Sequence, residues 1–357
     1  MRAEIETAKS AGFCFGVDRA VKLVYQALEE GRHVATLGPI VHNEAVVGDL
    51  NAKGARIISD PAELEPDETL IIRAHGVARS VYEQLEAQGN PVIDATCPFV
   101  ARIHKIVAEQ TASGRHVFIA GDPKHPEVQG IVGHCEGNCT VFRDKTELMC
   151  LIDRSLPQRL AIVAQTTYNK LLWGDCIELL PSDHPDLQVF DTICSATAAR
   201  QSDADALSRA SDLMIVVGGR HSSNTVKLFD VCSRNCPAWL IETAEELHAH
   251  ADEIRQKAAE IAAAAGSSHI LKIGITAGAS TPAHIIKEVQ TNMSGIFDTD
   301  TNIPESEDFA AAFEEELDKT FTKKIRKGDR VVGIVASISG NNEVMVDVGA
   351  KQTGYIT

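Results

Sequence analysis

Three cysteines of this chain, Cys14, Cys97 and Cys194, share one local setting although they lie far apart in the sequence. Each follows an apolar run typical of a strand and precedes a stretch with helical periodicity. A helix N-terminus favours the thiolate, which is the form of cysteine that binds metals. The pattern therefore predicts that the three cysteines converge on a metal cluster, with one metal position left open for chemistry.

The segments between these cysteines follow one plan, each of them about the size of a small domain. Helical patterns alternate with short apolar runs, and two strand-like runs in each third end in polar residues. The third segment lacks its last strand, which residues 3–14 can supply. The expected strands with their polar ends are 33–43, 69–76, 116–127, 160–167, 212–224 and 270–281.

Strands that alternate with helices predict parallel sheets with right-handed crossovers. Ligands of such sheets bind outside the carboxyl ends of the strands. The alternative, that strand ends are polar simply because they meet solvent, does not explain why cysteine, histidine and hydroxyl residues recur in register. We therefore expect a common centre lined by His42, His75, His125, Glu127, Thr166, Thr167, Ser222, Ser223, Asn224 and Ser280.

Composition narrows the class of protein. The chain has 357 residues, 44% of them hydrophobic, and a net charge of -16, which argues against broad nucleic-acid binding by the main body. No apolar run approaches the roughly 20 residues that span a bilayer. The N-terminus lacks the apolar core of a signal peptide, so a cytoplasmic location without membrane association is expected. Nine cysteines in that compartment suit metal or thiol chemistry better than disulfides.

Nine short stretches resemble the LytB/IspH family of 4-hydroxy-3-methylbut-2-enyl diphosphate reductases. They occur in the family's order between residue 12 and about residue 282, and together they are highly specific. No expected ligand position departs from the family pattern. The stretches are GFCFGVDRAV, LGPIVHN, IIRAHGV, DATCP, HPEVQG, QTT, DTICSATAARQ, GGRHSSNT and TAGAST.

The resemblance implies a trefoil of three pseudo-threefold-related α/β domains with parallel sheets around a central iron–sulfur cluster. Cys14, Cys97 and Cys194 would each bind one iron of a single [4Fe–4S] cluster, whose fourth iron has no protein ligand. The implied reaction is the two-electron reductive dehydroxylation of 4-hydroxy-3-methylbut-2-enyl diphosphate to isopentenyl diphosphate and dimethylallyl diphosphate. This is the last step of the non-mevalonate (MEP) isoprenoid pathway.

The same resemblance assigns roles to the other strand-end residues. Glu127 is the expected proton source, with Thr166 as a relay and His125 beside them, because a buried carboxyl with a raised pKa can donate a proton. The allylic diphosphate is expected to bind to neutral and cationic hydrogen-bond donors. These donors are His42, His75, His125, Thr166, Thr167, Ser222, Ser223, Asn224 and Ser280.

The electron source is expected to be a separate protein such as ferredoxin or flavodoxin. Neither GxGxxG nor GxxxxGK[ST] occurs in the sequence, which argues against direct use of a nucleotide cofactor.

Three other interpretations make different predictions. A radical enzyme requires CxxxCxxC in one loop, which is absent; a zinc site predicts a colourless protein; an iron–sulfur RNA-binding regulator predicts that the strand-end residues are dispensable.

The remaining cysteines are interpreted as packing residues. Two pairs, HCEGNC with Cys135 and Cys139 and CSRNC with Cys232 and Cys236, look like halves of a metal motif but lie outside the family motifs. Cys150 and Cys176 lie in amphipathic stretches, where a cysteine behaves as a small apolar residue.

The C-terminal part changes in composition. Residues 298–318 carry nine acidic and no basic side chains, and five basic residues follow within 323–330. The strand patterns after them resemble the start of an S1 domain, an OB-fold that needs five strands, so a truncated domain is expected. RNA or ribosome binding would require the complete S1 region.

The expected domains are a reductase body at 1–290 (thirds 15–97, 98–193, and 194–290 with 1–14), an acidic linker at 291–322 and an S1-like segment at 323–357.

Overall fold

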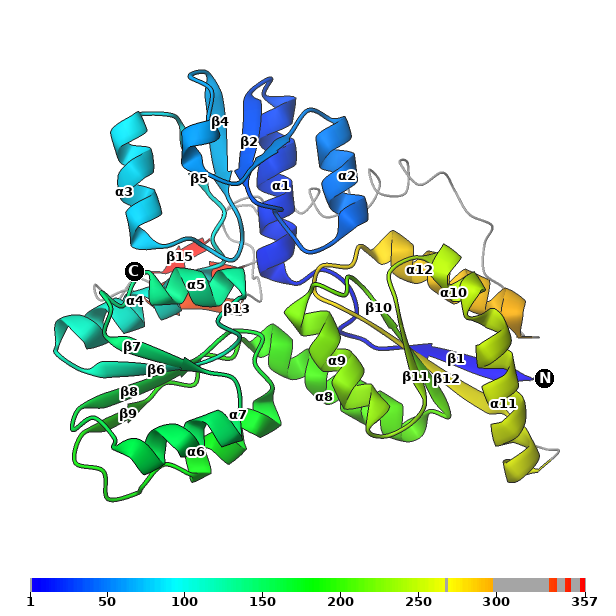
Figure 1. The fold of residues 1–357 in the computed structure, drawn as a ribbon. Helices are drawn as coiled ribbons and strands as arrows, with labels where there is room; N and C mark the ends of the chain where they lie inside the picture. The colour runs from blue at the N-terminus through cyan, green and yellow to red at the C-terminus, as the bar shows by residue number, and fades with distance from the viewer. Residues whose placement is uncertain (1, 267–268, 298–333, 339–343, 348–353, 357) are drawn as a thin grey trace. The chain divides into compact units, whose positions relative to one another are not determined.

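The computed structural model describes residues 2–266, 269–297, 334–338, 344–347 and 354–356. The chain divides into two units, Met1–Asp300 and Thr301–Thr357. The first unit contains three four-stranded parallel sheets, which Figure 1 shows as three lobes around a common centre. The fold is thus the α/β trefoil that the resemblance implies. None of the helices in the described ranges has both the length and the apolar character needed to cross a membrane.

The first lobe follows α1 (Phe15–Glu29) and has the strand order β3-β2-β4-β5. Its strands β2 and β4 are buried on both faces, so they form as near-continuous apolar runs. The strands are β2 (His33–Leu37), β3 (Arg56–Ile58), β4 (Glu68–Ile72) and β5 (Val92–Asp94). The helices are α2 (Glu44–Ala52), the 3₁₀ helix η1 (Pro61–Glu63) and α3 (Arg79–Gln88).

The second lobe repeats this order as β7-β6-β8-β9. Alternate residues of β6 enter different cores: Phe118 packs among the residues of one face and Ile119 among those of the other. Figure 1 shows α4 and α5 on one side of the sheet and α6 and α7 on the other. The elements are α4 (Pro98–Ala112), β6 (His116–Ala120), α5 (Pro126–Val132), β7 (Cys139–Phe142), α6 (Lys145–Arg154), β8 (Leu160–Ala164), α7 (Lys170–Glu178) and β9 (Leu187–Val189).

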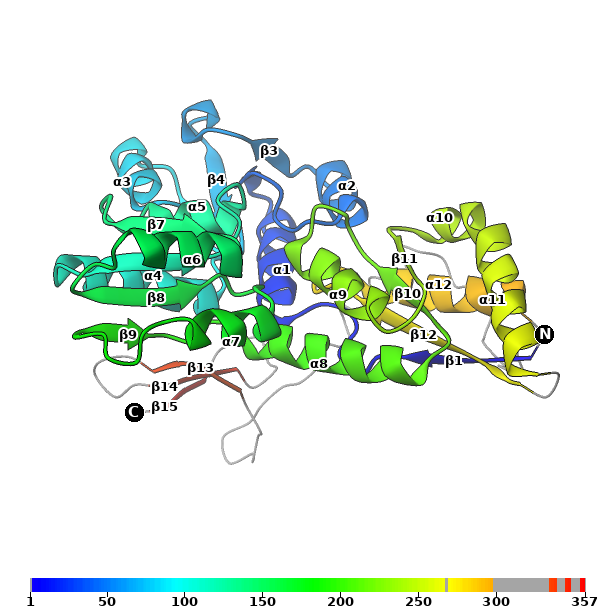
Figure 2. The same ribbon diagram turned by 60° about the horizontal axis from the view of Figure 1, so that its bottom comes forward.

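The third lobe has the equivalent order β11-β10-β12-β1, and β1 (Ala3–Thr7) from the N-terminus pairs in parallel with β12. Figure 2 shows these two strands side by side. Helix α12 ends at Ile296, beyond the boundary at residue 290 expected from the sequence. The other elements are α8 (Ser195–Ala210), β10 (Leu213–Val217), α9 (Ser223–Ser233), β11 (Ala238–Ile241), α10 (Ala244–Ala249), α11 (Ala251–Ala265), β12 (Leu271–Ala277) and α12 (Ala283–Ile296).

The second unit contains an antiparallel sheet of three strands within its described residues. These are β13 (Ile334–Ile338), β14 (Val344–Asp347) and β15 (Gly354–Ile356), in the order β13-β14-β15. The expected acidic linker lies outside the described residues from residue 298 onward. The S1-like interpretation stays a prediction.

Candidate active site

The three cysteines of the sequence pattern occupy the same structural position in their lobes. Cys14, Cys97 and Cys194 are the N-cap residues of α1, α4 and α8. Each cysteine N–H donates to a carbonyl of the loop that follows the neighbouring strand. The acceptors are Ala279 O at 3.1 Å, Ala74 O at 2.9 Å and Thr166 O at 3.2 Å. One repeated hydrogen bond thus holds each cysteine against the loop beside it.

All three cysteines line one central pocket. Helix α1 approaches Cys97 closely because Gly16 has no side chain: a Cβ there would lie 2.6 Å from Cys97 Sγ. Burial, together with the neighbouring Cys14, raises the pKa of the Cys97 thiol to about 12, and burial also raises the pKa of Cys194. A bound metal reverses such a shift by stabilising the thiolate. Three convergent thiols at helix N-termini therefore fit an iron–sulfur cluster.

The other pocket residues form two further threefold sets at the carboxyl ends of the strands. The third residue after β4, β8 and β12 is His75, Thr167 or Ser280. The fifth residue after β2, β6 and β10 is His42, His125 or Ser222. Each set therefore takes one side chain from every lobe, and all six side chains line the pocket.

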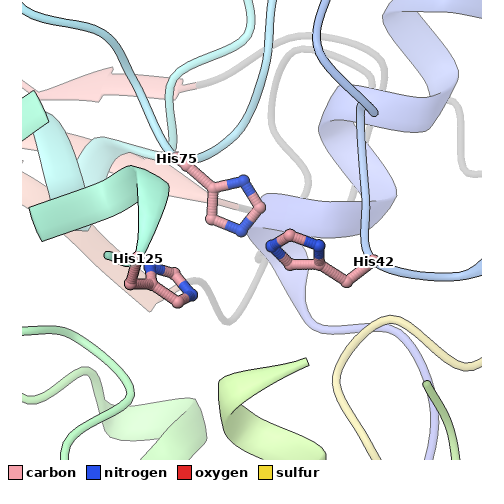
Figure 3. A group of neighbouring side chains, drawn as sticks. All are labelled: His42, His75 and His125. Carbon is pink, nitrogen blue, oxygen red and sulfur yellow. The ribbon is translucent and has the colours of Figure 1, made fainter. Parts of the chain in front are cut away.

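Three imidazoles face one another within the pocket, as Figure 3 shows. The ligand nitrogens of His42, His75 and His125 lie within 4.8 Å of one another. Burial lowers the pKa of all three, that of His125 to about 4, so the rings are neutral at neutral pH. Of the neutral and cationic donors expected at this site, burial favours the neutral form for these three rings.

The tautomer of His125 follows from its capping role. Its Nδ1 accepts a hydrogen bond from the N–H of Glu127 at 3.1 Å, so a neutral ring carries its proton on Nε2. Buried nitrogens of the other two rings, His42 Nε2 and His75 Nδ1, have no partner among the described residues. Buried polar atoms without partners require a ligand or water. These imidazoles are therefore ready to donate hydrogen bonds to an anion.

Glu127 is a buried carboxyl, 2% exposed, near the start of α5. Its Oε1 accepts a hydrogen bond from Thr166 N at 2.6 Å, and its Oε2 accepts one from Thr166 Oγ1 at 2.7 Å. Burial raises the pKa of Glu127 to about 7, although both hydrogen bonds oppose the shift. A carboxyl with this pKa is partly protonated at neutral pH and can act as a general acid.

The third lobe contributes uncharged polar groups. Asn224, 3% exposed, has neither its Nδ2 nor its Oδ1 paired with a described residue. Ser222 caps α9 by accepting a hydrogen bond from Thr225 N at 3.4 Å. Thr167 Oγ1 donates to Ser223 Oγ at 3.0 Å and so links the second lobe to the third. The free amide of Asn224 is therefore the clearest vacant donor and acceptor on this side.

The structure brings every residue predicted for the site into this pocket, and their individual roles stay predictions. Arg200 also lines the pocket but was missed by the sequence analysis. It is 5% exposed, and its Nη2 donates to Gly12 O at 2.6 Å, which braces the loop before Cys14 against α8. Its position in the TAARQ stretch, less than two helical turns after Cys194, could have indicated that it lies near the site.

The cysteines outside the pocket differ in burial. Cys135, Cys176 and Cys232 are buried in the cores of their lobes. Cys150 is exposed, so its interpretation as a packing residue was wrong. The amphipathic pattern of α6 did not reveal that this position faces solvent.

Known proteins are similar to this chain along most of its length. The family model described as LytB protein matches residues 5–294. A 4-hydroxy-3-methylbut-2-enyl diphosphate reductase of Caldanaerobacter subterraneus subsp. tengcongensis is 41% identical over 311 residues, which cover 84% of this chain and 99% of the relative. A reductase of the same name from Clostridioides difficile is 38% identical over 293 residues, covering 82% and 99%.

Two solved structures share the fold. A structure of (E)-4-hydroxy-3-methyl-but-2-enyl diphosphate reductase, described as the terminal enzyme of the non-mevalonate pathway, has 35% identity and a TM-score of 0.58. It covers 83% of this chain and 100% of its own. A structure of E-1-hydroxy-2-methyl-but-2-enyl-4-diphosphate reductase from Plasmodium falciparum has 25% identity and a TM-score of 0.75, covering 89% and 99%.

Proposed function

The chain belongs to the LytB family, and from this premise we propose that it reduces 4-hydroxy-3-methylbut-2-enyl diphosphate to isopentenyl and dimethylallyl diphosphates. In this reaction two electrons and two protons enter, the allylic carbon–oxygen bond breaks, and water leaves. The observation that carries the proposal is the buried Glu127–Thr166 pair in the same pocket as three convergent cysteines. A proton source thus lies beside a site suited to an electron carrier.

Cys14, Cys97 and Cys194 would hold one [4Fe–4S] cluster. Three thiols at helix N-termini fit this group, because cysteine thiolates are its usual ligands and the helix ends favour their charge. When bound, the cluster supplies the electrons and, at its fourth iron, Lewis acidity. The backbone hydrogen bonds from each cysteine to the adjacent loop would keep the three ligands in place.

Glu127 would supply the proton that converts the leaving hydroxyl into water. Its carboxyl lines the pocket, is partly protonated at neutral pH, and accepts a hydrogen bond from Thr166 Oγ1. The hydroxyl of Thr166 can both donate and accept, so it would pass the proton to the substrate oxygen. Proton transfer from a positioned side chain typically accelerates a reaction 10²- to 10⁴-fold.

The diphosphate would bind to the donors on the other sides of the pocket. The neutral imidazoles of His42, His75 and His125 offer N–H groups, and Asn224 offers its free amide. Thr167, Ser222, Ser223 and Ser280 would add hydroxyl donors. Hydrogen bonds to a charged group are stronger than those between neutral partners, which suits an anionic substrate.

The proposed reaction requires a source of electrons outside the chain. We propose that a separate ferredoxin or flavodoxin donates the electrons, since the sequence contains no nucleotide-binding fingerprint. RNA or ribosome binding would depend on a complete S1 region. A cytoplasmic location is the proposed setting for this reducing chemistry.

The test is anaerobic turnover of the substrate by cluster-reconstituted protein with a reduced artificial donor. Formation of both five-carbon diphosphates, lost in Cys14→Ser, is the expected result. A protein with full iron and sulfide content that forms neither product would contradict the substrate assignment and favour a regulatory iron–sulfur protein.

A further inference from the structure

The three histidines of the central pocket do not balance the negative charge of a diphosphate. A diphosphate ester carries several negative charges at neutral pH, yet His42, His75 and His125 are neutral there. Three neutral imidazoles with nitrogens within 4.8 Å could equally hold a divalent cation. The choice between an anion and a cation therefore depends on the fixed charges around the rings.

Arg73 provides such a charge. It follows β4 directly and precedes His75 by two residues. Its side chain extends over the neighbouring loop, since a Cβ on Gly38 would lie 2.5 Å from Arg73 Nη1. Gly38 has φ of +73° and precedes His42 by four residues, so the absence of a side chain there admits the guanidinium. Arg73 thus spans the two loops that carry His42 and His75.

Among the residues that the structure describes, no carboxylate forms an ion pair with the guanidinium of Arg73. Its Nε is buried and has no hydrogen-bond partner in the part of the chain that the structure describes. Burial lowers its pKa, whereas a facing carboxylate would raise it. The positive charge also contributes to the lowered pKa of all three imidazoles, which shows that it acts on the pocket. Arg73 is half-buried, and its buried Nε has no partner among the described residues, so an anion nearby would complete its surroundings.

In the other two lobes, the position equivalent to Arg73 is occupied by an uncharged residue. The residue that follows β8 is Gln165, and the residue that follows β12 is Gly278. Gln165 also spans two loops: its Nε2 donates to Thr167 Oγ1 at 2.8 Å, and its Oε1 accepts from Asp122 N at 3.4 Å. Spanning the loops therefore needs only an amide, and the charge of Arg73 requires a separate explanation.

We propose that Arg73 is a positioning residue for the diphosphate, whose negative charge it helps to balance from outside the pocket lining. This inference rests on the proposed function and names how that site selects an anion over a metal ion. The guanidinium stays charged at any physiological pH, and it acts on an anion that the neutral rings contact directly. It lies outside the residues that line the pocket, so it should affect substrate binding far more than the chemical step.

The experiment measures the inhibition constant of inorganic diphosphate and the kcat and KM of the substrate in cluster-loaded protein. Arg73→Gln copies the equivalent residue of the second lobe, and Arg73→Lys keeps the charge. For Arg73→Gln we expect KM and the diphosphate inhibition constant to rise about tenfold, with kcat within about threefold. Arg73→Lys should recover most of the affinity. Both constants should also depend less on salt in Arg73→Gln than in the wild-type chain.

Equal inhibition constants in the wild-type chain and Arg73→Gln would overturn the inference, as would an Arg73→Lys variant as weak as Arg73→Gln. Stoichiometric Zn²⁺ binding to the cluster-loaded protein that diphosphate displaces would also overturn it, because the rings would then be a cation site. A wild-type chain that turns over no substrate contradicts the proposed function instead. Direct calorimetric binding of inorganic diphosphate then still tests Arg73, since it requires no turnover.

Discussion

Two buried glutamates of this chain have opposite electrostatic surroundings. Glu68, at the amino end of β4, is 5% exposed, and Glu127, in the central pocket, is 2% exposed. A hydrogen bond from Arg56 lowers the pKa of Glu68, whereas burial raises the pKa of Glu127 to about 7. Burial alone therefore does not decide whether a carboxyl is ionised: the presence of a cationic partner does.

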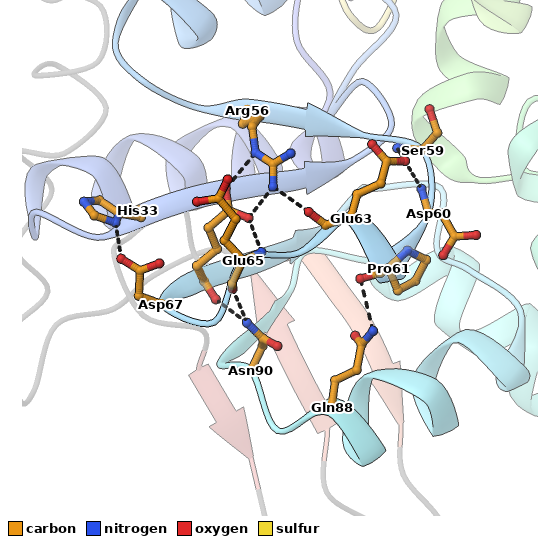
Figure 4. A network of polar contacts seen from close by, with 11 residues as sticks. His33, Arg56, Ser59, Asp60, Pro61, Glu63, Glu65, Asp67, Gln88 and Asn90 are labelled. Carbon is orange, nitrogen blue, oxygen red and sulfur yellow. Dashed lines mark hydrogen bonds and ion pairs between the residues drawn. The ribbon is translucent and has the colours of Figure 1, made fainter.

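Glu68 belongs to a network of hydrogen bonds with Arg56, Glu65 and Asn90. Figure 4 shows this network and labels Arg56, Glu63, Glu65 and Asn90 in it. Arg56 Nε donates to Glu68 Oε1 at 2.8 Å, and Arg56 Nη2 donates to the carbonyl oxygen of Glu63 at 2.8 Å. The N–H of Glu65 donates to Glu68 Oε2 at 2.9 Å, and Asn90 Nδ2 donates to Glu65 O at 2.8 Å. This network joins β3, β4 and the loops around them at the amino ends of the strands.

The central pocket, at the carboxyl ends of the strands, has the opposite character. Among the described residues, polar atoms of His42, His75 and Asn224 in the pocket are buried without a partner, as is Nε of the nearby Arg73. Matched networks stabilise a fold, whereas unmatched buried groups cost stability and are kept where a ligand completes them. The comparison predicts that changes in the pocket affect function and that changes in the network affect stability.

The largest expected effect is that of Cys97→Ser. Loss of an outer hydrogen-bond partner already costs a metal site 10- to 100-fold, so loss of a ligand should reduce turnover by more than about 100-fold. Iron and sulfide content, measured on the same anaerobic preparation, should fall with it. The matched control is Cys150→Ser at the exposed cysteine, which should keep both iron and turnover. Full iron content in Cys97→Ser would remove this residue from the ligand set.

Glu127→Gln should remove a pH-dependent cost to stability. The pKa of Glu127 rises from 4.5 to about 7 on folding, so the folded wild-type chain loses up to about 3 kcal/mol as pH rises through this range. Below pH 4.5 the two chains should differ little from this source. Thermal unfolding at pH 5 and pH 8 checks the sign: the advantage of the variant should grow with pH. An advantage that shrinks would mean that Glu127 is ionised in the folded protein.

Asn224→Leu replaces an unpaired amide of the pocket by an apolar side chain of similar size. KM should rise about tenfold, because the substrate loses hydrogen bonds, while the melting temperature should stay equal or increase. The matched control is Asn90→Leu in the network of Figure 4, where the amide is paired. That variant should lower the melting temperature and leave KM unchanged. Reversal of these two outcomes would break the comparison.

Glu68→Gln should have the smallest effect. The folded-state pKa of Glu68 is lowered, so its stabilising contribution is present above its unfolded pKa and is lost as pH falls through the folded value. Because Arg56 is partly exposed, about 1 kcal/mol is expected near neutral pH. Urea unfolding at pH 7 and pH 3 should show a difference between the two chains that shrinks in acid. A constant difference would place the effect in packing rather than charge.

Much of the site could be predicted from the sequence because parallel sheets place their strand ends together. The pattern of Cys14, Cys97 and Cys194 contained both the strand before and the helix after each residue, and these local signals determine the N-cap position. The polar residues at strand ends followed from the same rule. Both inferences needed only short stretches of chain.

The missed features depend on contacts between distant segments. Arg73 and Arg200 stand in the IIRAHGV and DTICSATAARQ stretches, but their contacts do not follow from the sequence. Tertiary structure shows that Arg73 Nε has no partner among the described residues and that Arg200 braces the loop before Cys14. The neutral state of the histidines depends on burial, which the sequence does not give. Cys150 was assigned to the core because a short helix has an uncertain apolar face, and its exposure depends on how α6 packs.

The most direct test of the account is the turnover of Glu127→Gln under anaerobic conditions, compared with Glu68→Gln in protein of equal iron content. We predict that kcat falls at least about 100-fold in Glu127→Gln and is unchanged in Glu68→Gln. The kcat of the wild-type chain should also decline as pH rises through about 7, where Glu127 loses its proton. Unchanged kcat in Glu127→Gln would contradict the claim that this buried carboxyl delivers the proton.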